Sequence, residues 1–256
     1  MQPYAINEFA AKAVLVTGAS TGIGAAVAAA FARHGAQVAI HYHRNREAAE
    51  AGRDAIVQHG GRAVLIRGDL GEPAQGAKVV GEAAEMLGGL DILINNAGSL
   101  TGRTPFLQWT DETFDTVMNL NARSVITASQ AAVPHLEAGG GTIVNIGSIA
   151  GSDGGGPGAG HYAAAKAYVH SLTRHMARDL AGRGIRVNAV APGVIATPFH
   201  AATPPDRMEA MRNAVALGRV GEPDDCVGPI LFLCSGAMSG YVTGQILHVN
   251  GGQYMP

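Results

Sequence analysis

A tyrosine and a lysine four residues apart, Tyr162 and Lys166, lie in the alanine-rich stretch HYAAAKAYVH. Alanine favours helix, and residues i and i+4 of a helix share one face, so the phenol and the ammonium are expected side by side. A neighbouring cation stabilises a phenolate and lowers the pKa of tyrosine from its ordinary value of about 10. The pair is therefore a candidate acid and base for proton transfer.

A second candidate site is the glycine-rich stretch TGASTGIG at residues 17–24. It follows an apolar run and opens an amphipathic one, which brings backbone N–H groups and a helix N-terminus to a phosphate. Its spacing differs from G-x-G-x-x-G and lacks the Gly-Lys-Ser/Thr ending of a P-loop, so an ordinary tight turn is the alternative. Asp69, after a later apolar run, is expected either to bind an adenine edge or to cap a helix.

Short β-branched runs alternate with alanine-rich amphipathic segments along the chain. Strands are predicted at residues 12–18, 37–42, 62–68, 90–98, 141–148, 185–193 and 245–252. Helices are predicted at about 23–34, 45–59, 74–88, 111–137, 161–181 and 223–235. This alternation is typical of βαβ crossovers. We expect a single α/β domain over residues 1–256, a Rossmann-type doubly wound seven-stranded parallel sheet with helices on both faces and a ligand crevice at the strand ends.

Composition narrows the class of protein. Apolar residues make up 47% of the 256, charged residues 15%, and the formal net charge is −2, which argues against a disordered tail, a nucleic-acid binder or a membrane-surface helix. The longest apolar runs, such as residues 25–32, fall far short of the roughly 20 residues of a membrane span. A cytoplasmic protein is expected. Cys226 and Cys234 are predicted to fill the core without forming a disulfide.

The order of the motifs resembles that of short-chain dehydrogenases/reductases. The resemblance covers essentially the whole chain and is carried by Thr17-Gly18-x3-Gly22-Ile23-Gly24, Asn95-Asn96-Ala97-Gly98, Ser148, Tyr162-x3-Lys166 and Pro192-Gly193-x3-Thr197. It implies an enzyme that moves a hydride between a nicotinamide cofactor and a secondary alcohol or ketone. One departure is that 14 positions separate Ser148 from Tyr162, about one more than is common, with the excess expected in the loop GSDGGGPGAG.

The resemblance also implies roles for individual residues. Tyr162 would be the general acid/base, and Lys166 would activate it and bind the nicotinamide ribose. Ser148 would hydrogen-bond the substrate oxygen, while Asn121 would hold a water in a proton relay. The implied cofactor-binding residues are Gly18, Ser20, Thr21, Gly22, Ile23, Gly24, Tyr42, Arg44, Asp69, Leu70, Asn95, Ala97, Gly98, Tyr162, Lys166, Pro192, Gly193, Ile195 and Thr197.

The end of the second predicted strand favours NADP(H) over NAD(H). A carboxylate there would repel the extra phosphate of NADP, but the residue is Tyr42. The basic residues Arg44 and Arg46, with His43 and Asn45, follow and could bind that phosphate. Thr21 stands where many NADP-preferring relatives carry a basic residue, and the arginines could simply solvate a helix start. We expect NADP(H) preference with some NAD(H) use.

Each chemical interpretation has a structural alternative. Tyr162 could place its hydroxyl at the surface, Lys166 could extend into solvent, and Ser148 could satisfy a turn. His41 and His43 are spaced for one strand face but lack an evident carboxylate or cysteine partner, so no metal is expected. The amides of NNAG could chiefly brace the sheet, with Gly98 leaving room for adenosine. A nucleotide-sensing or scaffold protein without catalysis is the rival function.

The substrate is expected to be a small polar molecule: a sugar, a sugar acid or a hydroxy acid. Four basic residues could line the mouth of the site, namely Arg103, His161, His200 and Arg207. A loop and helix at about 196–219 could cover the substrate. The alternative substrate is a 3-oxoacyl thioester, because the C-terminal YVTGQILHVNGGQYM resembles that of the corresponding reductases, and Arg174 and Arg178 could contact an acidic carrier.

Assembly is predicted from the resemblance. In that family the helices at 111–137 and 161–181 pack against symmetry mates, so a homotetramer is expected. Small residues on the second helix would permit close approach, namely Ala163, Ala164, Ala167 and Ser171. Their alternative role is packing on their own sheet.

Overall fold

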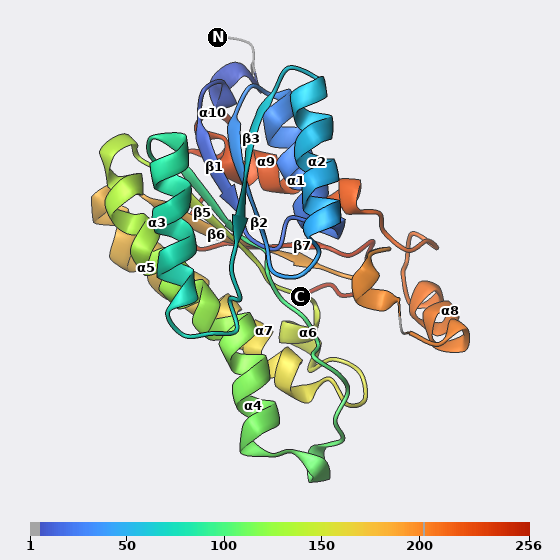
Figure 1. Ribbon diagram of the computed structural model, residues 1–256. Helices are drawn as coiled ribbons and strands as arrows, with labels where there is room; N and C mark the ends of the chain where they lie inside the picture. The colour runs from blue at the N-terminus through green and yellow to red at the C-terminus, as the bar shows by residue number, and fades with distance from the viewer. Residues whose placement is uncertain (1–5, 202) are drawn as a thin grey trace.

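Seven parallel strands form one sheet at the centre of the molecule (Figure 1). The computed structural model describes residues 6–201 and 203–256. The strands are β1 (Ala13–Val16), β2 (Gln37–Tyr42), β3 (Arg62–Arg67), β4 (Ile92–Asn95), β5 (Thr142–Ile146), β6 (Arg186–Pro192) and β7 (Ile246–Val249). Their order is β3-β2-β1-β4-β5-β6-β7, and every neighbouring pair is parallel. The predicted doubly wound sheet is confirmed, and the chain order reverses between β1 and β4, where such sheets bind ligands.

Helices cover both faces of the sheet (Figure 1). One apolar cluster joins alternate strand residues to α1 (Gly22–Arg33), α2 (Arg46–Gln58) and α9 (Pro223–Cys234). The other joins the intervening residues to α3 (Gln75–Leu87), α5 (Ser124–Leu136) and α7 (Gly160–Leu180). On β1, Val14 and Val16 belong to the first cluster and Leu15 to the second, because successive strand side chains point to opposite faces.

The helix predicted over 111–137 is interrupted, so that prediction was wrong in detail. The structure has α4 (Asp111–Met118), a π-helical turn at Asn119–Arg123 and then α5. The side-chain amide of Asn121 donates to the carbonyl of Val117, 2.9 Å away. In an α-helix the Val117 carbonyl would accept from the backbone N–H of Asn121, but here it accepts from the Asn121 side chain. The backbone N–H of Ser124 bonds to the carbonyl of Asn119, five residues back, which is the π-helical pattern.

Several short elements were not predicted separately. They include α6 (Ala150–Asp153), α8 (Pro205–Asn213), α10 (Gly236–Ser239) and short 3₁₀ turns. The helix α6 and three glycines at positive φ, Gly154, Gly155 and Gly158, take up the long connection between Ser148 and Tyr162. The segment at 196–219 contains the 3₁₀ turn Pro198–His200 and α8, which extends away from the sheet (Figure 1).

Two further predictions concern buried residues. Cys226 and Cys234 are buried and free, as expected. Ala163 is only 4% exposed and packs within its own chain, which is the alternative role expected for the small residues of α7. Ala164, Ala167 and Ser171 are exposed.

No helix within residues 6–201 and 203–256 is long and apolar enough to cross a membrane.

Candidate active site

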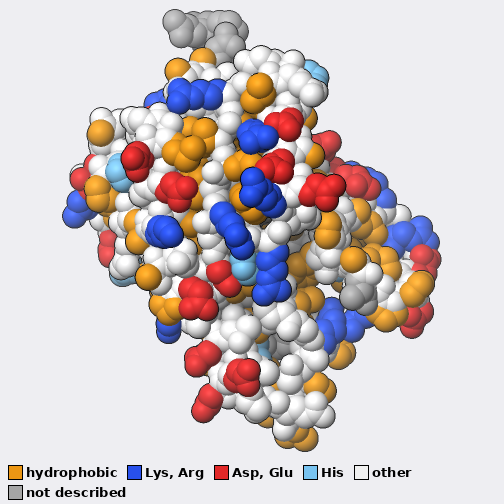
Figure 2. All heavy atoms as spheres, in the orientation of Figure 1, with side chains coloured by type: hydrophobic (Ala, Val, Ile, Leu, Met, Phe, Trp, Pro, Cys, Tyr) orange, Lys and Arg blue, Asp and Glu red, His pale blue; other side chains and the backbone are white. Residues whose placement is uncertain are grey.

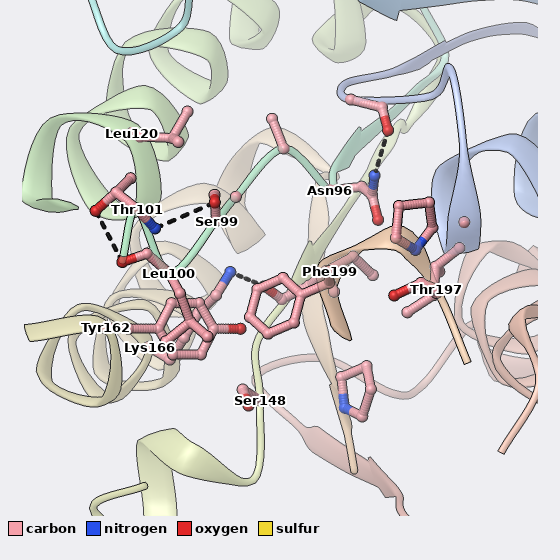
Figure 3. Close-up of a pocket in the computed structure, with 18 of the residues that line it drawn as sticks. Asn96, Ser99, Leu100, Thr101, Leu120, Ser148, Tyr162, Lys166, Thr197 and Phe199 are labelled. Carbon is pink, nitrogen blue, oxygen red and sulfur yellow. Dashed lines mark hydrogen bonds between the residues drawn. The ribbon is translucent and has the colours of Figure 1, made fainter. Parts of the chain in front are cut away.

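A pocket of about 1190 Å³ lies at the carboxyl ends of the strands. It is lined by most of the predicted site residues, namely Gly18, Ser20, Thr21, Gly22, Ile23, Tyr42, Arg44, Asp69, Leu70, Ala97, Gly98, Ser148, Tyr162, Lys166, Pro192, Gly193, Ile195 and Thr197. Three predicted residues, Gly24, Asn95 and Asn121, lie behind its wall rather than in its lining. Figure 3 shows residues from several elements converging on this space, with Tyr162, Lys166 and Phe199 close together.

The glycine loop at the start of α1 is held by a buried histidine. Gly18 and Gly22 have φ of 61° and 59°, a region that favours glycine. The Gly18 N–H donates to Nδ1 of His41 at 3.0 Å, and Nε2 of the same ring lies 3.2 Å from the carbonyl oxygen of Gly68. Burial lowers the pKa of His41 to about 4, so the ring is neutral and its Nε2–H donates to Gly68. His41 thus joins the loop to the end of β3, a role that the sequence analysis missed.

The two asparagines of NNAG face different ways. Asn95 is 4% exposed and its side-chain amide donates to Ser129 and Asn145, so this side chain braces α5 and β5, the alternative role expected for the NNAG amides. Asn96 lines the pocket and donates to the carbonyls of Thr17 and Gly18. A side chain on Gly24 would collide with this arrangement, because its Cβ would lie 2.5 Å from the Asn96 amide nitrogen. Gly24 therefore serves close packing beneath the loop.

Gly98 lies beside two predicted catalytic residues. A Cβ there would lie 2.7 Å from Oδ1 of Asn121 and 3.2 Å from Nζ of Lys166. The missing side chain of Gly98 therefore leaves room for these two groups, and the expected room for adenosine stays a prediction. Asn121 is fully buried and fixed by bonds to the backbone N–H and carbonyl of Ser99, at 3.1 and 2.9 Å. Its Oδ1 therefore has one orientation, beside the missing side chain of Gly98.

Tyr162, Ser148 and Lys166 meet at the end of β5. Ser148 and Tyr162 line the same end of the pocket, and Nζ of Lys166 lies 5.6 Å from the centre of the phenol ring. Burial raises the pKa of Tyr162 to about 12, while the Ser148 hydroxyl acts in the opposite direction. The expected lowering of this pKa by Lys166 is not what the structure has: the ammonium is directed to the carbonyl of Ile146, and desolvation of the phenol dominates. The serine loop is supported by His170, whose Nε2 lies 3.4 Å from the Ser148 nitrogen.

The opposite end of the pocket begins at Tyr42, the last residue of β2, and Arg44. Arg44 is exposed, whereas Arg46 bonds to Glu50 at 2.8 Å and the Asn45 side chain caps α2. Asp69 accepts a bond from the Gly71 N–H and lies 3.3 Å from His43. The alternative role of Asp69 as a helix cap was wrong, because the residue before α3 is Ala74. Across the described residues no cluster of three His, Cys, Asp or Glu side chains is placed to hold a metal ion.

The tyrosine end of the pocket is bordered by two loops and α8. Phe199, which was not predicted, lies with its ring centre 5.5 Å from that of Tyr162 (Figure 3). Arg103, His200 and Arg207 line the pocket as expected. His161 does not: it is 7% exposed and stacks on Trp109 at 3.7 Å, because it lies on a side of α7 turned toward α4.

Comparisons with known proteins identify the relatives of this chain. Residues 18–253 match a family model described as enoyl-(acyl carrier protein) reductase. The chain is 38% identical over 245 residues to the 3-oxoacyl-(acyl-carrier-protein) reductase FabG of Staphylococcus aureus strain Mu50. The matched region covers 95% of this chain and 98% of that protein.

Two solved structures have nearly the same fold. The NADH-dependent reductase A1-R′, described as responsible for alginate metabolism, aligns with a TM-score of 0.90 and 36% identity over 98% of this chain and 100% of that one. It has also been solved with NAD. A short-chain dehydrogenase of Burkholderia cenocepacia J2315 in complex with NADP aligns with a TM-score of 0.89 and 39% identity, over 96% of this chain and 98% of that one.

The sheet, the glycine loop and the pocket define an oxidoreductase that uses a nicotinamide cofactor. The chain belongs to the short-chain dehydrogenase/reductase family and is an NAD(P)-dependent enzyme.

Proposed function

We propose that this enzyme interconverts a secondary alcohol and a ketone with Tyr162 as the general acid/base. The convergence of Tyr162, Ser148 and Lys166 at one end of the pocket carries the proposal. The bound cofactor supplies or accepts the hydride. In reduction, the protonated Tyr162 hydroxyl donates to the carbonyl oxygen, and the Ser148 hydroxyl holds that oxygen by a second hydrogen bond. A phenol whose pKa is about 12 is protonated at neutral pH, which suits donation.

Lys166 and Asn121 support this proton transfer. The buried ammonium places positive charge near the phenol, which favours the phenolate that forms after donation. Oδ1 of Asn121 lies beside the missing side chain of Gly98, as Nζ of Lys166 does, and can accept a bond from a water that delivers protons toward Lys166. Asn121 therefore acts as a positioning residue, and the π-helical turn fixes its amide.

The residues of the other half of the pocket fit a dinucleotide. The glycines at positive φ and the N-terminus of α1 offer N–H groups to a pyrophosphate, and a Cβ on Gly22 would lie 3.1 Å from Thr197, so only bare backbone leaves room between these segments. The preferred cofactor is NADP(H), with some use of NAD(H). Arg44 supports this preference because it is exposed in the pocket lining, whereas the neighbouring Arg46 bonds to Glu50. The two solved relatives were crystallised with NAD and with NADP.

The proposed substrate is a small polar molecule of the sugar, sugar-acid or hydroxy-acid class. Arg103, His200 and Arg207 beside Tyr162 support it. The description of A1-R′ as a reductase of alginate metabolism concerns a carbohydrate pathway. In this proposal α8, which contributes Arg207 and Met211 to the lining, covers the bound substrate.

The second candidate substrate is a 3-oxoacyl thioester. It is favoured by the 38% identity to FabG of Staphylococcus aureus. Arg174 and Arg178 are exposed one turn apart on α7 and could contact an acidic carrier protein. Turnover is therefore compared between a panel of sugars and sugar acids and a set of 3-oxoacyl thioesters. A strong preference for the thioesters would reverse the choice of substrate.

The mechanism is tested with Tyr162→Phe. The variant should bind NADPH as the parent does, while turnover falls by about 10²- to 10⁴-fold because the proton donor is lost. Binding is followed by the change in protein fluorescence or by calorimetry, and turnover by absorbance of the cofactor. Unchanged turnover would remove Tyr162 from the mechanism. A parent that binds cofactor but turns over no alcohol or ketone would favour the nucleotide-sensing alternative.

The proposed assembly is a homotetramer in the cytoplasm. The exposed small residues Ala164, Ala167 and Ser171 on α7 support close approach of a second copy. Exposed apolar side chains near β7, among them Phe232, Tyr241 and Leu247, support a further contact. Light scattering at micromolar concentration should give four times the chain mass, and a monomer would reject the assembly.

A further inference from the structure

Two arginines from distant segments face each other across the mouth of the pocket. Arg103 lies on the loop that follows β4, and Arg207 lies in the first turns of α8. Both approach Gly156, in the glycine-rich loop between Ser148 and Tyr162. Nη2 of Arg207 is 2.8 Å, and Nη1 of Arg103 is 4.0 Å, from where a Cβ on Gly156 would lie. Figure 2 shows Lys and Arg side chains bordering the hollow between α8 and the body of the molecule. The two guanidinium groups thus share one small region of the pocket.

The charge of this pair is not compensated. Within residues 6–201 and 203–256, no carboxylate lies within 4.0 Å of either guanidinium, whereas Arg212, further along α8, is paired with Glu209. Asp153 lines the same pocket, but one of its oxygens accepts a bond from the Gly155 N–H. Burial and the charge of Arg207 both lower the pKa of Arg103, as expected for two cations that lie close together. Such a pair favours an anion placed between the groups.

The backbone around Arg103 is held in place. Its Nη1 donates to the carbonyl of Pro157 at 2.8 Å, and the N–H of Thr104 donates to Gly158 at 3.0 Å. The chain reaches this position through Thr101 and Gly102, both at positive φ, at 54° and 113°. A positive φ is strained for threonine. Two hydrogen bonds hold Thr101 in this conformation: its N–H donates to the Ser99 hydroxyl and its own hydroxyl donates to the carbonyl of Leu100 (Figure 3). Arg103 is therefore a fixed feature of the pocket mouth.

We propose that Arg103 and Arg207 form a subsite for a carboxylate of the substrate, so that the enzyme acts on an oxo acid and the corresponding hydroxy acid. The inference rests on the proposed function, because the reacting carbon is placed at Tyr162, in the same pocket. Guanidinium groups match the two oxygens of a carboxylate, and two of them from separate segments fix its orientation. The subsite would orient the substrate carbonyl toward Tyr162 and Ser148 and select against uncharged ketones.

A phosphate is the other oxyanion that such a pair could bind. A carrier-type thioester has its phosphate at the far end of a long pantetheine arm, many bonds from the reacting carbonyl. A carboxylate lies only a few bonds from that carbonyl in an oxo acid. Because the arginines and Tyr162 line one pocket, the carboxylate fits the arrangement better.

The experiment compares substrates that differ in this one group. D-gluconate is paired with D-sorbitol, which has a hydroxymethyl group in place of the carboxylate, and acetoacetate is paired with its methyl ester. Acetoacetyl-CoA is paired with the N-acetylcysteamine thioester, which lacks the phosphate. Each is assayed with the parent, Arg103→Ala, Arg207→Ala, the double variant and the control Arg212→Ala. Binding of gluconate and sorbitol is measured by calorimetry in parallel, so that a result is obtained without turnover.

We expect the parent to prefer at least one acid over its uncharged partner. Each single arginine variant should lose about 10- to 100-fold in kcat/KM for that acid, mainly through KM, with little change for the uncharged partner. Arg212→Ala should behave as the parent. Equal loss on acids and uncharged partners would overturn the subsite, as would a parent that binds no acid more tightly than its partner. Loss confined to acetoacetyl-CoA would show that the pair binds phosphate instead.

The substrate pairs and the variants also separate failure of the carboxylate subsite from failure of the proposed function. Turnover of uncharged ketones that is insensitive to the arginines would retain the mechanism at Tyr162 and remove the subsite. Loss of turnover in Tyr162→Phe together with arginine-dependent acid preference would support both. Arginine-dependent binding of gluconate without any turnover would support the subsite and contradict the catalytic proposal.

Discussion

The ammonium of Lys166 donates a hydrogen bond to the carbonyl oxygen of Ile146, 2.7 Å away, at the carboxyl end of β5. Lys166 is only 3% exposed, and burial lowers its pKa to about 8. None of the carboxylates in the described part of the chain forms an ion pair with it. The site therefore holds a buried cation that has no carboxylate partner among the described residues and donates to a backbone carbonyl, which is costly for folding.

Lys166→Met should abolish turnover and stabilise the fold. The folded pKa of about 8 lies below the ordinary value of 10.5, so the unfolded chain binds more protons between these values, and the penalty is fully present below pH 8. Relief of this penalty, offset by the lost hydrogen bond, should raise the free energy of unfolding by about 1–3 kcal/mol at pH 7. Urea unfolding at pH 7 and pH 10 measures it. The gain over the parent should shrink at pH 10, and a pH-independent loss of stability would contradict the account.

Gly98→Ala should impair catalysis without disturbing the fold globally. The new Cβ would lie 2.7 Å from Oδ1 of Asn121 and 3.2 Å from Nζ of Lys166, and both groups would have to move. A displacement of this size should lower kcat on the order of tenfold to 100-fold. The matched control is Gly81→Ala in α3, where a Cβ meets nothing within 4 Å. That substitution should raise the free energy of unfolding by about 0.5–1 kcal/mol and leave kcat unchanged. Equal kcat in both variants would remove the steric role of Gly98.

The fold and the reacting pair could be predicted because they depend on local pattern. Alternating apolar runs determine the parallel sheet, and Tyr162 and Lys166 share a helix face through their spacing alone. The interruption at Asn121 could not be predicted, because it depends on a side chain taking a carbonyl within its own helix. The role of His41 was also hidden, because its partners, Gly18 and Gly68, are distant in sequence and meet it only when the sheet forms.

His41 should make the protein sensitive to acid. Burial is the largest cause of its low pKa, and His43 also lowers it, while the Gly68 carbonyl and Asp69 raise it. Between pH 6.5 and about 4 the unfolded chain binds a proton at this site and the folded chain does not, so stability falls as the pH falls. The contribution should reach about 3 kcal/mol. His170, whose pKa is also lowered to about 4, adds a separate decrease.

The measurement compares the parent with His41→Gln, whose side chain does not titrate. Urea unfolding is followed at several pH values from 7 down to 4.5. The variant should lose less stability over this range than the parent, whatever its stability at pH 7. Parallel curves for the two proteins would show that His41 is not responsible for the decrease.

The last prediction concerns the proposed NADP(H) preference. Arg44 is exposed in the pocket lining after β2, and no carboxylate among the described residues lies within 4.0 Å of it. Arg44→Ala should lower kcat/KM for NADPH by about tenfold, because a charge-assisted bond to the phosphate is lost, and should leave kcat/KM for NADH nearly unchanged. Arg44→Glu should go further and reverse the preference, because a carboxylate repels the phosphate.

Two comparisons make this prediction specific. Arg46→Ala is the control, because Arg46 is two residues away but bonds to Glu50 and does not line the pocket, so both cofactors should be used as in the parent. Tyr42→Asp should also shift preference toward NADH. However, Tyr42 is 7% exposed and packs in the apolar cluster of that face, so this variant should also lose stability, which thermal unfolding with and without cofactor would reveal. A parent that already prefers NADH, or an equal effect of Arg44→Ala on both cofactors, would reject the phosphate site while leaving the proposed roles of Tyr162 and Lys166 unaffected.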